Sequence, residues 1–231
     1  MFVARFALIR AQTAFDLPLL ESYFLPDLTT DFKPLPPAFY GPSAEAVASR
    51  LLGHWLIRNT PEGLLGGPIV ETEAYLENDP ACHAAPGPTP RNRVMFGPPG
   101  HGYVYFIYGC HFCVNAVCRP VGVGEAVLIR AIDPVFGLEL MRRRRLVRED
   151  CHLTSGPGKL CQALEVDRSF DGVDLCSLSA RLFIAENPRV RQFRKKRGPL
   201  VITKRIGISR AAHLPLRFFL QASSSVSRSS R

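Results

Sequence analysis

The sequence lacks any long apolar run and any internal repeat. Its apolar runs are far shorter than the 18 or more residues of a membrane helix, and its first residues have neither the sustained apolar core nor the small-residue cleavage site of a secretion signal. With 231 residues, 46% of them hydrophobic, the chain can form one compact domain with an ample core. We therefore expect a soluble intracellular protein that is not attached to a membrane.

The sequence also lacks the cysteine pattern of a disulfide framework or a zinc finger. Its seven cysteines are an odd number, and several lie in apolar surroundings, which favours reduced, buried thiols (Cys113, Cys118, Cys161 and Cys176). The CxxC pair of Cys110 and Cys113 has no second pair at zinc-finger spacing, and a returning strand would direct the two sulfur atoms apart. We therefore predict no metal site.

Acidic residues are absent after Glu186, whereas twelve lysines and arginines lie between Arg189 and Arg231. The rest of the chain is nearly balanced, with 17 basic and 20 acidic residues, so the net charge of +9 comes from the C-terminal part. A one-sided basic segment, including RQFRKKR at 191–197, is typical of a protein that binds a polyanion. The alternative is a flexible, solubilising loop, because basic loops of that kind are frequent.

The most informative stretch is residues 66–131. Between Pro68 and Leu76 the residues alternate as in a β-strand, which places Glu71, Glu73 and Tyr75 on one face and an apolar set on the other. Acidic residues are poor strand formers, so two on one face indicate a front that lines a cleft. A simply solvated front face is the alternative, since half-exposed antiparallel strands are common.

A long loop and a hairpin follow this strand. The loop at 79–99 is rich in proline and glycine and carries His83, Arg91, Asn92 and Arg93, and loops of this length in a compact domain are usually functional. The hairpin pairs a strand at 102–108, with three tyrosines, with a returning strand at 112–118 that has Asn115 in its middle. A further strand at 126–132 places Arg130 on an apolar face, where its charge needs a partner such as a carboxylate.

The remaining chain gives weaker signals. Ser43 is placed as the N-cap of a helix that ends at Gly53, and a strand follows at 54–58. A helix at 134–147 should turn Leu138, Met141 and Leu146 inward, with the arginines at 142–145 outside. Short apolar pieces at 183–186, 200–203 and 205–208 can complete a sheet, and the segment 214–220 can close the core. We interpret residues 1–37 as an N-terminal arm with a short helix at 15–23, and 221–231 as a disordered Ser/Arg tail.

The segment SGPGK at 155–159 leads into a helix, and its free backbone N–H groups and Lys159 favour an anion. The segment is not a Walker A loop, because Leu153 and Leu160 stand where that motif needs glycine and a hydroxyl residue. A phosphate of a nucleic-acid backbone therefore fits better than a nucleotide, with a plain helix start as the alternative.

Several of these segments together resemble the alkyladenine (3-methyladenine) DNA glycosylase family. The resemblance covers roughly residues 38–220 and rests on VETEAYL, ACHA, TPRN, MFGPPG, YVYFIYG, a Cys-Val-Asn, VLIRA, LTSGPGKLCQAL and RIGI. It implies an α+β fold: a single mixed domain with a curved, mainly antiparallel sheet, flanking helices and a protruding DNA-inserting β-hairpin. It implies no metal or organic cofactor.

The resemblance also implies roles for individual residues. Glu73 matches the carboxylate that activates the attacking water, and Arg130 matches the residue that orients this water. Tyr108 matches the wedge that takes the place of the extruded base in the stack. Four residues match the pocket for that base, among them an asparagine that discriminates against the guanine amino group (Tyr75, His83, Tyr105 and Asn115). We assign contacts with the DNA backbone to three cations (Arg91, Lys159 and Arg142).

The implied activity is that of a monofunctional DNA glycosylase. It would flip out alkylated purines such as 3-methyladenine from double-stranded DNA, hydrolyse the N-glycosidic bond and so initiate base excision repair, acting as a monomer. The physical chemistry agrees, because a positively charged alkylated purine is a good leaving group and binds an aromatic pocket by cation–π attraction. No lysine lies between residues 66 and 130, so an amine nucleophile is unavailable there and the product should be an intact abasic site.

Two other classes of protein fit part of the pattern. A glycoside hydrolase could use Glu71 and Glu73 as its carboxylate pair, but neighbours on one strand cannot easily flank a sugar from both faces. A non-catalytic module that binds damaged nucleic acid would share the tyrosines and the charge but would not need Glu73. The chain departs from the family pattern at Glu77, Cys110 and His111, which can alter lesion preference or the grip on the duplex.

Overall fold

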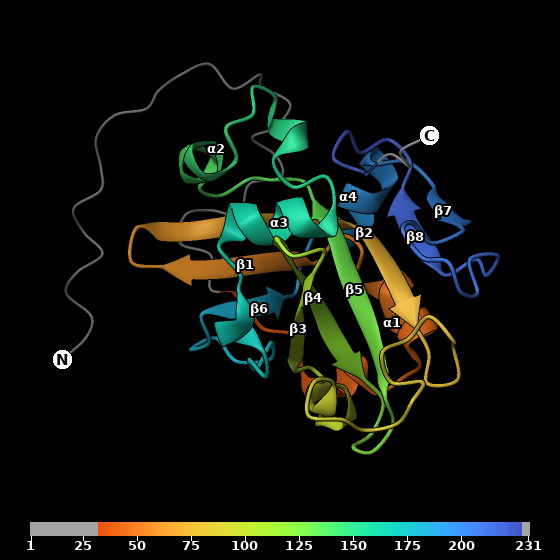
Figure 1. Cartoon of the computed structure of the whole chain (residues 1–231). Coiled ribbons are helices and arrows are strands. Elements are labelled where there is room, and N and C mark those ends of the chain that lie inside the picture. The colour runs from red at the N-terminus through yellow and green to blue at the C-terminus, as the bar shows by residue number, and fades with distance from the viewer. Residues whose placement is uncertain (1–31, 228–231) are drawn as a thin grey trace. The chain divides into compact units, whose positions relative to one another are not determined.

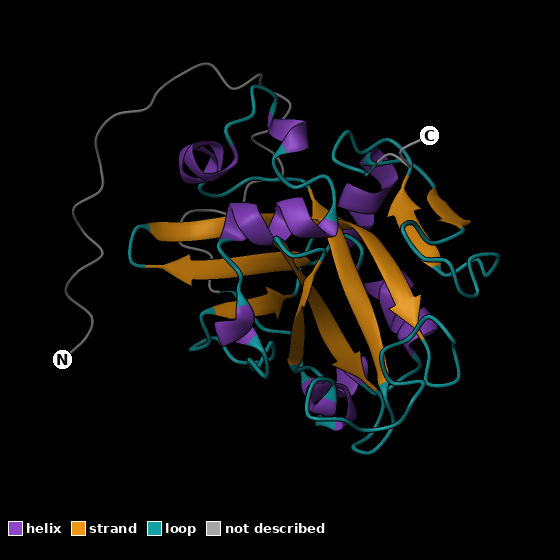
Figure 2. Ribbon diagram, viewed as in Figure 1, coloured by secondary structure: helices purple, strands orange, loops and turns teal. Residues whose placement is uncertain are grey.

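The computed structural model describes residues 32–227. This part has the predicted α+β architecture, in which a curled antiparallel sheet is flanked by helices (Figure 1, Figure 2). The strands are β1 (Trp55–Thr60), β2 (Gly63–Tyr75), β3 (Gly102–Ile107), β4 (His111–Cys118), β5 (Glu125–Ile132), β6 (Leu182–Ala185), β7 (Leu200–Thr203) and β8 (Arg217–Leu220). The α-helices are α1 (Ala44–Leu51), α2 (Leu138–Arg145), α3 (Pro157–Leu164) and α4 (Val190–Lys196).

Strand β2 is the centre of the sheet. The strand order is β3-β4-β5-β2-β1-β6, and each neighbouring pair is antiparallel. The first half of β2 pairs with β1, whereas its second half pairs with β5 on one side and with β8 on the other. β8 in turn forms a separate hairpin with β7. The C-terminal strands therefore lie beside the two glutamates of β2.

A pair of glycines, Gly66 and Gly67, comes just before the point where β2 changes partners. A Cβ atom on Gly67 would lie 1.8 Å from the backbone oxygen of Asp133, and one on Gly66 would lie 2.1 Å from that of Leu56. Only glycine allows backbones to approach this closely. The register of β2 against β5 then shifts on both sides of Glu71, as in a β-bulge, and bulges redirect side chains.

Helices cover the sheet and fix the faces of β2. Ser43 caps α1 as predicted, with its hydroxyl oxygen accepting from the backbone N–H of Ala46. The Thr72 hydroxyl donates to the carbonyl of Ala48 in α1, so the face of β2 that carries Thr72 packs against this helix. Helix α3 packs against β4 and β5. The opposite face of β2 carries the glutamates.

The solvated front face is ruled out, because Glu71 and Glu73 have no exposed surface. β2 is a central strand that is covered on both faces, so the side that carries the glutamates is buried as well. The carboxylates must then be paired or hydrogen-bonded within the protein, since an isolated buried charge is strongly destabilising.

Two sequence-based expectations about secondary structure are wrong. Leu146 does not face inward: α2 ends at Arg145, Leu146 adopts a positive φ as the C-cap, and 89% of its surface is exposed. Residues 205–208 are not a strand: the side chain of Arg205 contacts Ala74 and Asp79, and the segment has no backbone pairing with a neighbouring strand.

The two ends of the described part are integrated into the domain. Phe32 packs edge-on against Trp55, Phe136 and Phe183, and residue 34 bridges to β6. The expected disorder of the tail is wrong for residues 221–227, because Ser223, Ser225 and Ser227 are buried. A serine-rich segment can become ordered when buried charged groups offer partners for its hydroxyl and N–H groups. The expected helix at 15–23 lies outside the described residues.

The described cysteines form no disulfide, and Cys113, Cys118 and Cys161 are buried as predicted. Cys176 is half-buried. Within residues 32–227, every helix is too short or too polar to cross a bilayer.

Candidate active site

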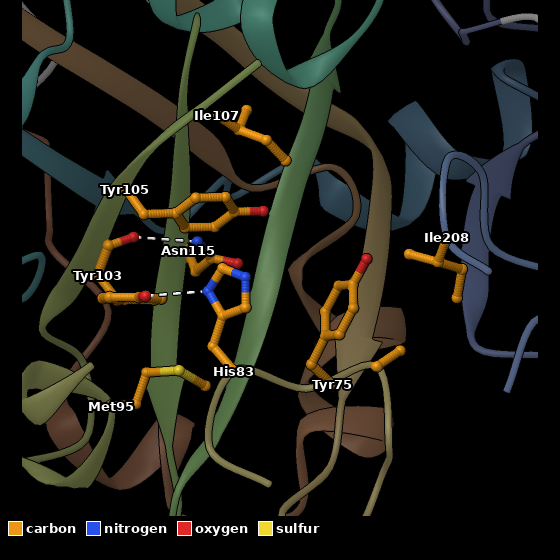
Figure 3. Close-up of a pocket in the computed structure, with 9 residues that line it drawn as sticks. Tyr75, His83, Met95, Tyr103, Tyr105, Ile107, Asn115 and Ile208 are labelled. Carbon is orange, nitrogen blue, oxygen red and sulfur yellow. Dashed lines mark hydrogen bonds between the residues drawn. The ribbon is translucent and has the colours of Figure 1, made fainter. Parts of the chain in front are cut away.

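The four residues assigned to a base pocket all line one cavity, which opens between β2, the loop after it and the β3–β4 hairpin (Figure 3). The cavity has a volume of about 90 Å³. Its walls are aromatic, aliphatic and amide side chains (Tyr75, Ala81, His83, Met95, Tyr103, Tyr105, Ile107, Asn115 and Ile208).

Aromatic rings form two sides of this cavity. His83 and Tyr105 lie with their ring centroids 4.5 Å apart, and Tyr75 stands across from them (Figure 3). Burial is the main cause that raises the pKa of Tyr75 and of Tyr105, so both phenols stay protonated and neutral. Aromatic side chains on two sides of a cavity suit a flat, electron-poor ligand.

The imidazole of His83 is held by a residue that the sequence did not single out. Its Nδ1 lies 3.0 Å from the hydroxyl of Tyr103. Burial, with Arg91 as a second cause, lowers the pKa of His83, so the ring is neutral at pH 7. The amide nitrogen of Asn115 donates to the carbonyl oxygen of Tyr103 at 3.0 Å, which fixes the orientation of this amide in the cavity wall (Figure 3). Tyr103 thus orients two of the pocket residues.

Glu73 is linked to this cavity through Tyr75. Its Oε2 accepts a hydrogen bond from the hydroxyl of Tyr75 at 3.0 Å. Its Oε1 accepts from the backbone N–H of Ile206 at 2.8 Å and lies 3.1 Å from Nη1 of Arg130. A carboxylate oxygen can accept two hydrogen bonds, so Oε2 keeps the capacity to accept one from a water molecule. Arg130 therefore has the expected carboxylate partner, and it pairs with two carboxylates, Glu73 and Glu71.

Glu71 is the second of these carboxylates and accepts four hydrogen bonds. Its Oε1 accepts from Nε of Arg130 at 2.8 Å and from Nε of Arg217 at 2.7 Å. Its two oxygens also accept from the hydroxyl and the backbone N–H of Ser227, both at 2.7 Å. Burial would raise the pKa of Glu71, but the two guanidinium groups and Ser227 together hold it below its usual value. A carboxylate bound in this way is not free to act on a sugar, which disfavours the glycoside hydrolase.

The segment after β7 closes the site on the side of Tyr75. Arg205 is buried, donates to the carbonyl oxygen of Ala74 and forms an ion pair with Asp79. Its guanidinium carbon also lies 4.6 Å from the centre of the Tyr75 ring. These contacts anchor the segment that delivers the N–H group of Ile206 to Glu73 and the side chain of Ile208 to the cavity wall.

Tyr108 projects from the tip of the β3–β4 hairpin. It is 74% exposed, and its hydroxyl lies 3.4 Å from the carbonyl oxygen of Gly207. Both Tyr108 and Gly109 have positive φ angles, 54° and 70°, which form the tight turn between the strands. A large aromatic side chain is thereby exposed beside the mouth of the cavity.

The three cations assigned to the DNA backbone differ in how they are engaged. Lys159 is exposed in the first turn of α3, with Nζ 3.5 Å from the hydroxyl of Ser155. Arg91 is exposed and donates to the carbonyl oxygen of Phe106 at 3.5 Å. Arg142 forms a bidentate pair with Asp150, at 2.7 and 2.8 Å, and a further ion pair with Glu139. Its charge is already balanced, so its role as a phosphate ligand has the weakest support.

The two cysteines of the CxxC pair differ in their surroundings, since Cys110 is exposed and Cys113 is buried. Within residues 32–227, one group of three possible ligand side chains converges (Glu149, Cys151 and His152). It lies on the surface, and the glutamate already contacts both the thiol and the imidazole.

Sequence reasoning missed several residues around Glu73. Glu71 was considered only as a partner of Glu73 on the same strand face and as a possible glycoside hydrolase carboxylate, and Tyr103 only as one of three tyrosines. Arg217 and Ser227 lie 146 and 156 residues from Glu71 along the chain. The RIGI motif was the one signal that could have identified Arg205 and Ile206.

Comparison with known proteins matches this sequence to one family. The family model described as methylpurine-DNA glycosylase (MPG) matches residues 38–224. A protein of Methanoculleus marisnigri is 49% identical over 194 residues, which cover 84% of this chain and 98% of that protein. A protein of Carboxydothermus hydrogenoformans is 46% identical with the same coverage, and one of Rubrobacter xylanophilus is 52% identical over 74% of this chain and 85% of its own. All three are named "Putative 3-methyladenine DNA glycosylase". The chain thus belongs to the methylpurine-DNA glycosylase family.

Proposed function

We propose that this protein is a monofunctional 3-methyladenine DNA glycosylase, which flips alkylated purines out of duplex DNA and hydrolyses the N-glycosidic bond with a water activated by Glu73. The family assignment supports the reaction class. The observation that carries the mechanism is a buried carboxylate that is linked to an aromatic cavity through Tyr75 and is bound by an arginine, a phenol and a backbone N–H group.

The cavity is the proposed binding site for the extruded base. A purine inserted between Tyr75 and the rings of His83 and Tyr105 would have aromatic side chains on both sides. Alkylation at N3 or N7 gives the base a positive charge, so stacking on neutral tyrosines gains a cation–π term. The same charge weakens the bond to the sugar, because the base departs as a neutral molecule.

Glu73 is the proposed general base, and its ion pair with Arg130 orients it. Water attacks C1′ as the N-glycosidic bond breaks, Glu73 takes the proton, and the electron pair of the broken bond stays with the leaving base. Because the leaving group is already cationic, no protein acid is needed to protonate it. The products are the free base and an abasic site.

Tyr108 is the proposed wedge in the vacated position of the stack. Its exposure leaves the ring free to enter a duplex, and the tight turn at Tyr108 and Gly109 makes the tip narrow. Extrusion of a base costs a few kcal/mol, and stacking of the wedge offsets part of this cost. Lys159 and Arg91, both exposed, are proposed to bind backbone phosphates.

The rival function is a module that binds damaged DNA without chemistry. The cavity alone would serve both functions, but binding gives no reason for the network of donors around Glu73. The deciding experiment incubates the protein with duplex DNA methylated to contain 3-methyladenine and separates free base from DNA. Release of 3-methyladenine with formation of abasic sites supports the glycosylase. Retention of the lesion in a stable protein–DNA complex, with no released base, would refute it.

A further inference from the structure

A buried network on the side of Arg130 away from the cavity is not used by the chemistry described above. It consists of Glu71 on β2, Arg217 on β8 and Ser227 in the C-terminal segment, all at most 9% exposed. Its contacts are short and charge-assisted, between 2.7 and 2.8 Å. Hydrogen bonds of this kind are stronger than neutral ones and restrict orientation.

Arg130 is the link between this network and Glu73. Its Nε donates to Glu71 and its Nη2 donates to the hydroxyl of Ser227 at 3.1 Å, which leaves Nη1 directed at Glu73. A guanidinium is planar, so two fixed nitrogens fix the third. The position of Nη1 of Arg130 beside Glu73 is thus set by Glu71 and Ser227, which do not line the cavity.

The charges of the network also bear on Glu73. Two carboxylates (Glu71 and Glu73) face two guanidinium groups (Arg130 and Arg217), so the buried group has no net charge. Arg130 divides its attraction between both carboxylates. If Glu71 were neutral, Arg130 would be attracted by Glu73 alone. Glu73 would then hold a proton less readily and would be a weaker base.

We propose that Glu71, held by Arg217 and Ser227, is a positioning residue that aims Arg130 at Glu73 and preserves the basicity of this carboxylate, so that the C-terminal segment is part of the catalytic machinery. The proposal rests on the proposed function, and it adds residues that neither approach the substrate nor line the cavity. Ser227 is its key contact, because its one hydroxyl accepts from Arg130 and donates to Glu71.

Other groups around Glu73 do not replace this network. From β2 it is faced by the Tyr75 phenol, from the segment after β7 by the N–H of Ile206, and from β5 by Arg130. The Cys113 thiol on β4 also senses the charge of Glu73, and burial raises the pKa of this thiol to about 11, so it stays neutral near pH 7. Arg130 is the one side-chain cation among these contacts.

The test compares two serines of the same segment. Ser227→Ala removes the hydroxyl that joins Arg130 to Glu71, whereas Ser225→Ala removes an equally buried hydroxyl without a contact to either charged residue. Single-turnover release of 3-methyladenine is measured from pH 5 to 9 with saturating enzyme. We expect Ser227→Ala to slow release on the order of 10-fold, with lesion affinity nearly unchanged, because a misaimed catalytic group lowers the rate without weakening the stack. Ser225→Ala should behave as wild type, and Ser227→Thr should restore most of the rate.

Glu71→Gln gives the second readout. It should slow release on the order of 100-fold and move the acid limb of the pH–rate profile to lower pH, because a negative charge beside Glu73 is lost. A purely structural role would lower the melting temperature without moving this limb. If Glu71→Gln does not fold, the serine variants still decide.

The outcomes separate the two proposals. An active wild type with equal rates for Ser227→Ala and Ser225→Ala, whether both unchanged or both reduced, overturns the positioning role and leaves the glycosylase intact. An acid limb that stays in place in folded Glu71→Gln also overturns the proposal. A wild type that releases no base refutes the proposed function, and the positioning role with it.

Discussion

Replacement of Tyr108 by alanine distinguishes a DNA wedge from a structural tyrosine. Tyr108 is 74% exposed, so only about a quarter of its surface, roughly 50 Å², is in contact with the protein. At ~25 cal/mol per Å², loss of this contact amounts to about 1 kcal/mol of stability. Alanine has the same Cβ atom as tyrosine, so the strain of the positive φ is unchanged by the substitution.

The effect on DNA binding should be larger. One lost stack between an aromatic ring and a base weakens binding by roughly 1–3 kcal/mol, a factor of about 5 to 150 in the dissociation constant. Tyr108→Phe is the matched control, because it keeps the ring and removes only the hydroxyl that lies near Gly207. This variant should bind lesion-containing duplex almost as wild type does.

The assay measures the melting temperature and the affinity for a lesion-containing duplex on the same preparations. Tyr105→Ala serves as the structural reference, since Tyr105 is 9% exposed and its truncation should cost about 3–5 kcal/mol of stability. A large loss of stability in Tyr108→Ala, with unchanged affinity for the duplex, would refute the wedge.

Three further predictions follow from other parts of the molecule. Burial, assisted by Arg194 and Arg50, lowers the pKa of His54 to about 4, so the free energy of unfolding should be highest above pH 6.5 and fall by about 3 kcal/mol as the pH drops towards 4. Urea unfolding at several pH values measures this fall, and the same fall in His54→Gln would contradict its assignment to His54. Lys159→Ala should weaken binding to damaged and undamaged duplex alike and reduce the salt slope by about 1, whereas Arg142→Ala should lower the melting temperature and leave the slope unchanged. Borohydride should trap no covalent protein–DNA adduct, because no lysine lies between residues 66 and 130 and none lines the cavity; a trapped adduct would exclude a monofunctional enzyme.

Local patterns along the chain predicted the part of the structure that local interactions determine. Alternation identified the strand that carries Glu71 and Glu73, and the turn residues identified the hairpin below Tyr108. The buried charge of Arg130 predicted a carboxylate partner, which is present. In each case, the residues needed for the inference lie within one or two strands.

Long-range contacts could not be predicted in the same way. Ser227 lies in a serine-rich tail whose composition is typical of disorder, and its order comes from Glu71, a residue 156 positions away. Leu146 was predicted to face inward because apolar spacing does not reveal that the helix ends one residue earlier. The burial of Glu71 and Glu73 depends on β8 and the C-terminal segment, whose pairing with β2 has no signature in the strand itself.

The role of Glu73 as the catalytic base is the central claim, and Glu73→Gln tests it most directly. Glutamine keeps the size of the side chain and one acceptor oxygen, which can accept from the Ile206 N–H group in place of Oε1, while its amide can donate to the Tyr75 hydroxyl; it cannot take a proton from water. The measurement is the single-turnover release of 3-methyladenine from methylated duplex DNA, with lesion binding measured in parallel. We predict that base release is abolished while lesion binding stays nearly intact. Release by Glu73→Gln at the wild-type rate would contradict the mechanism.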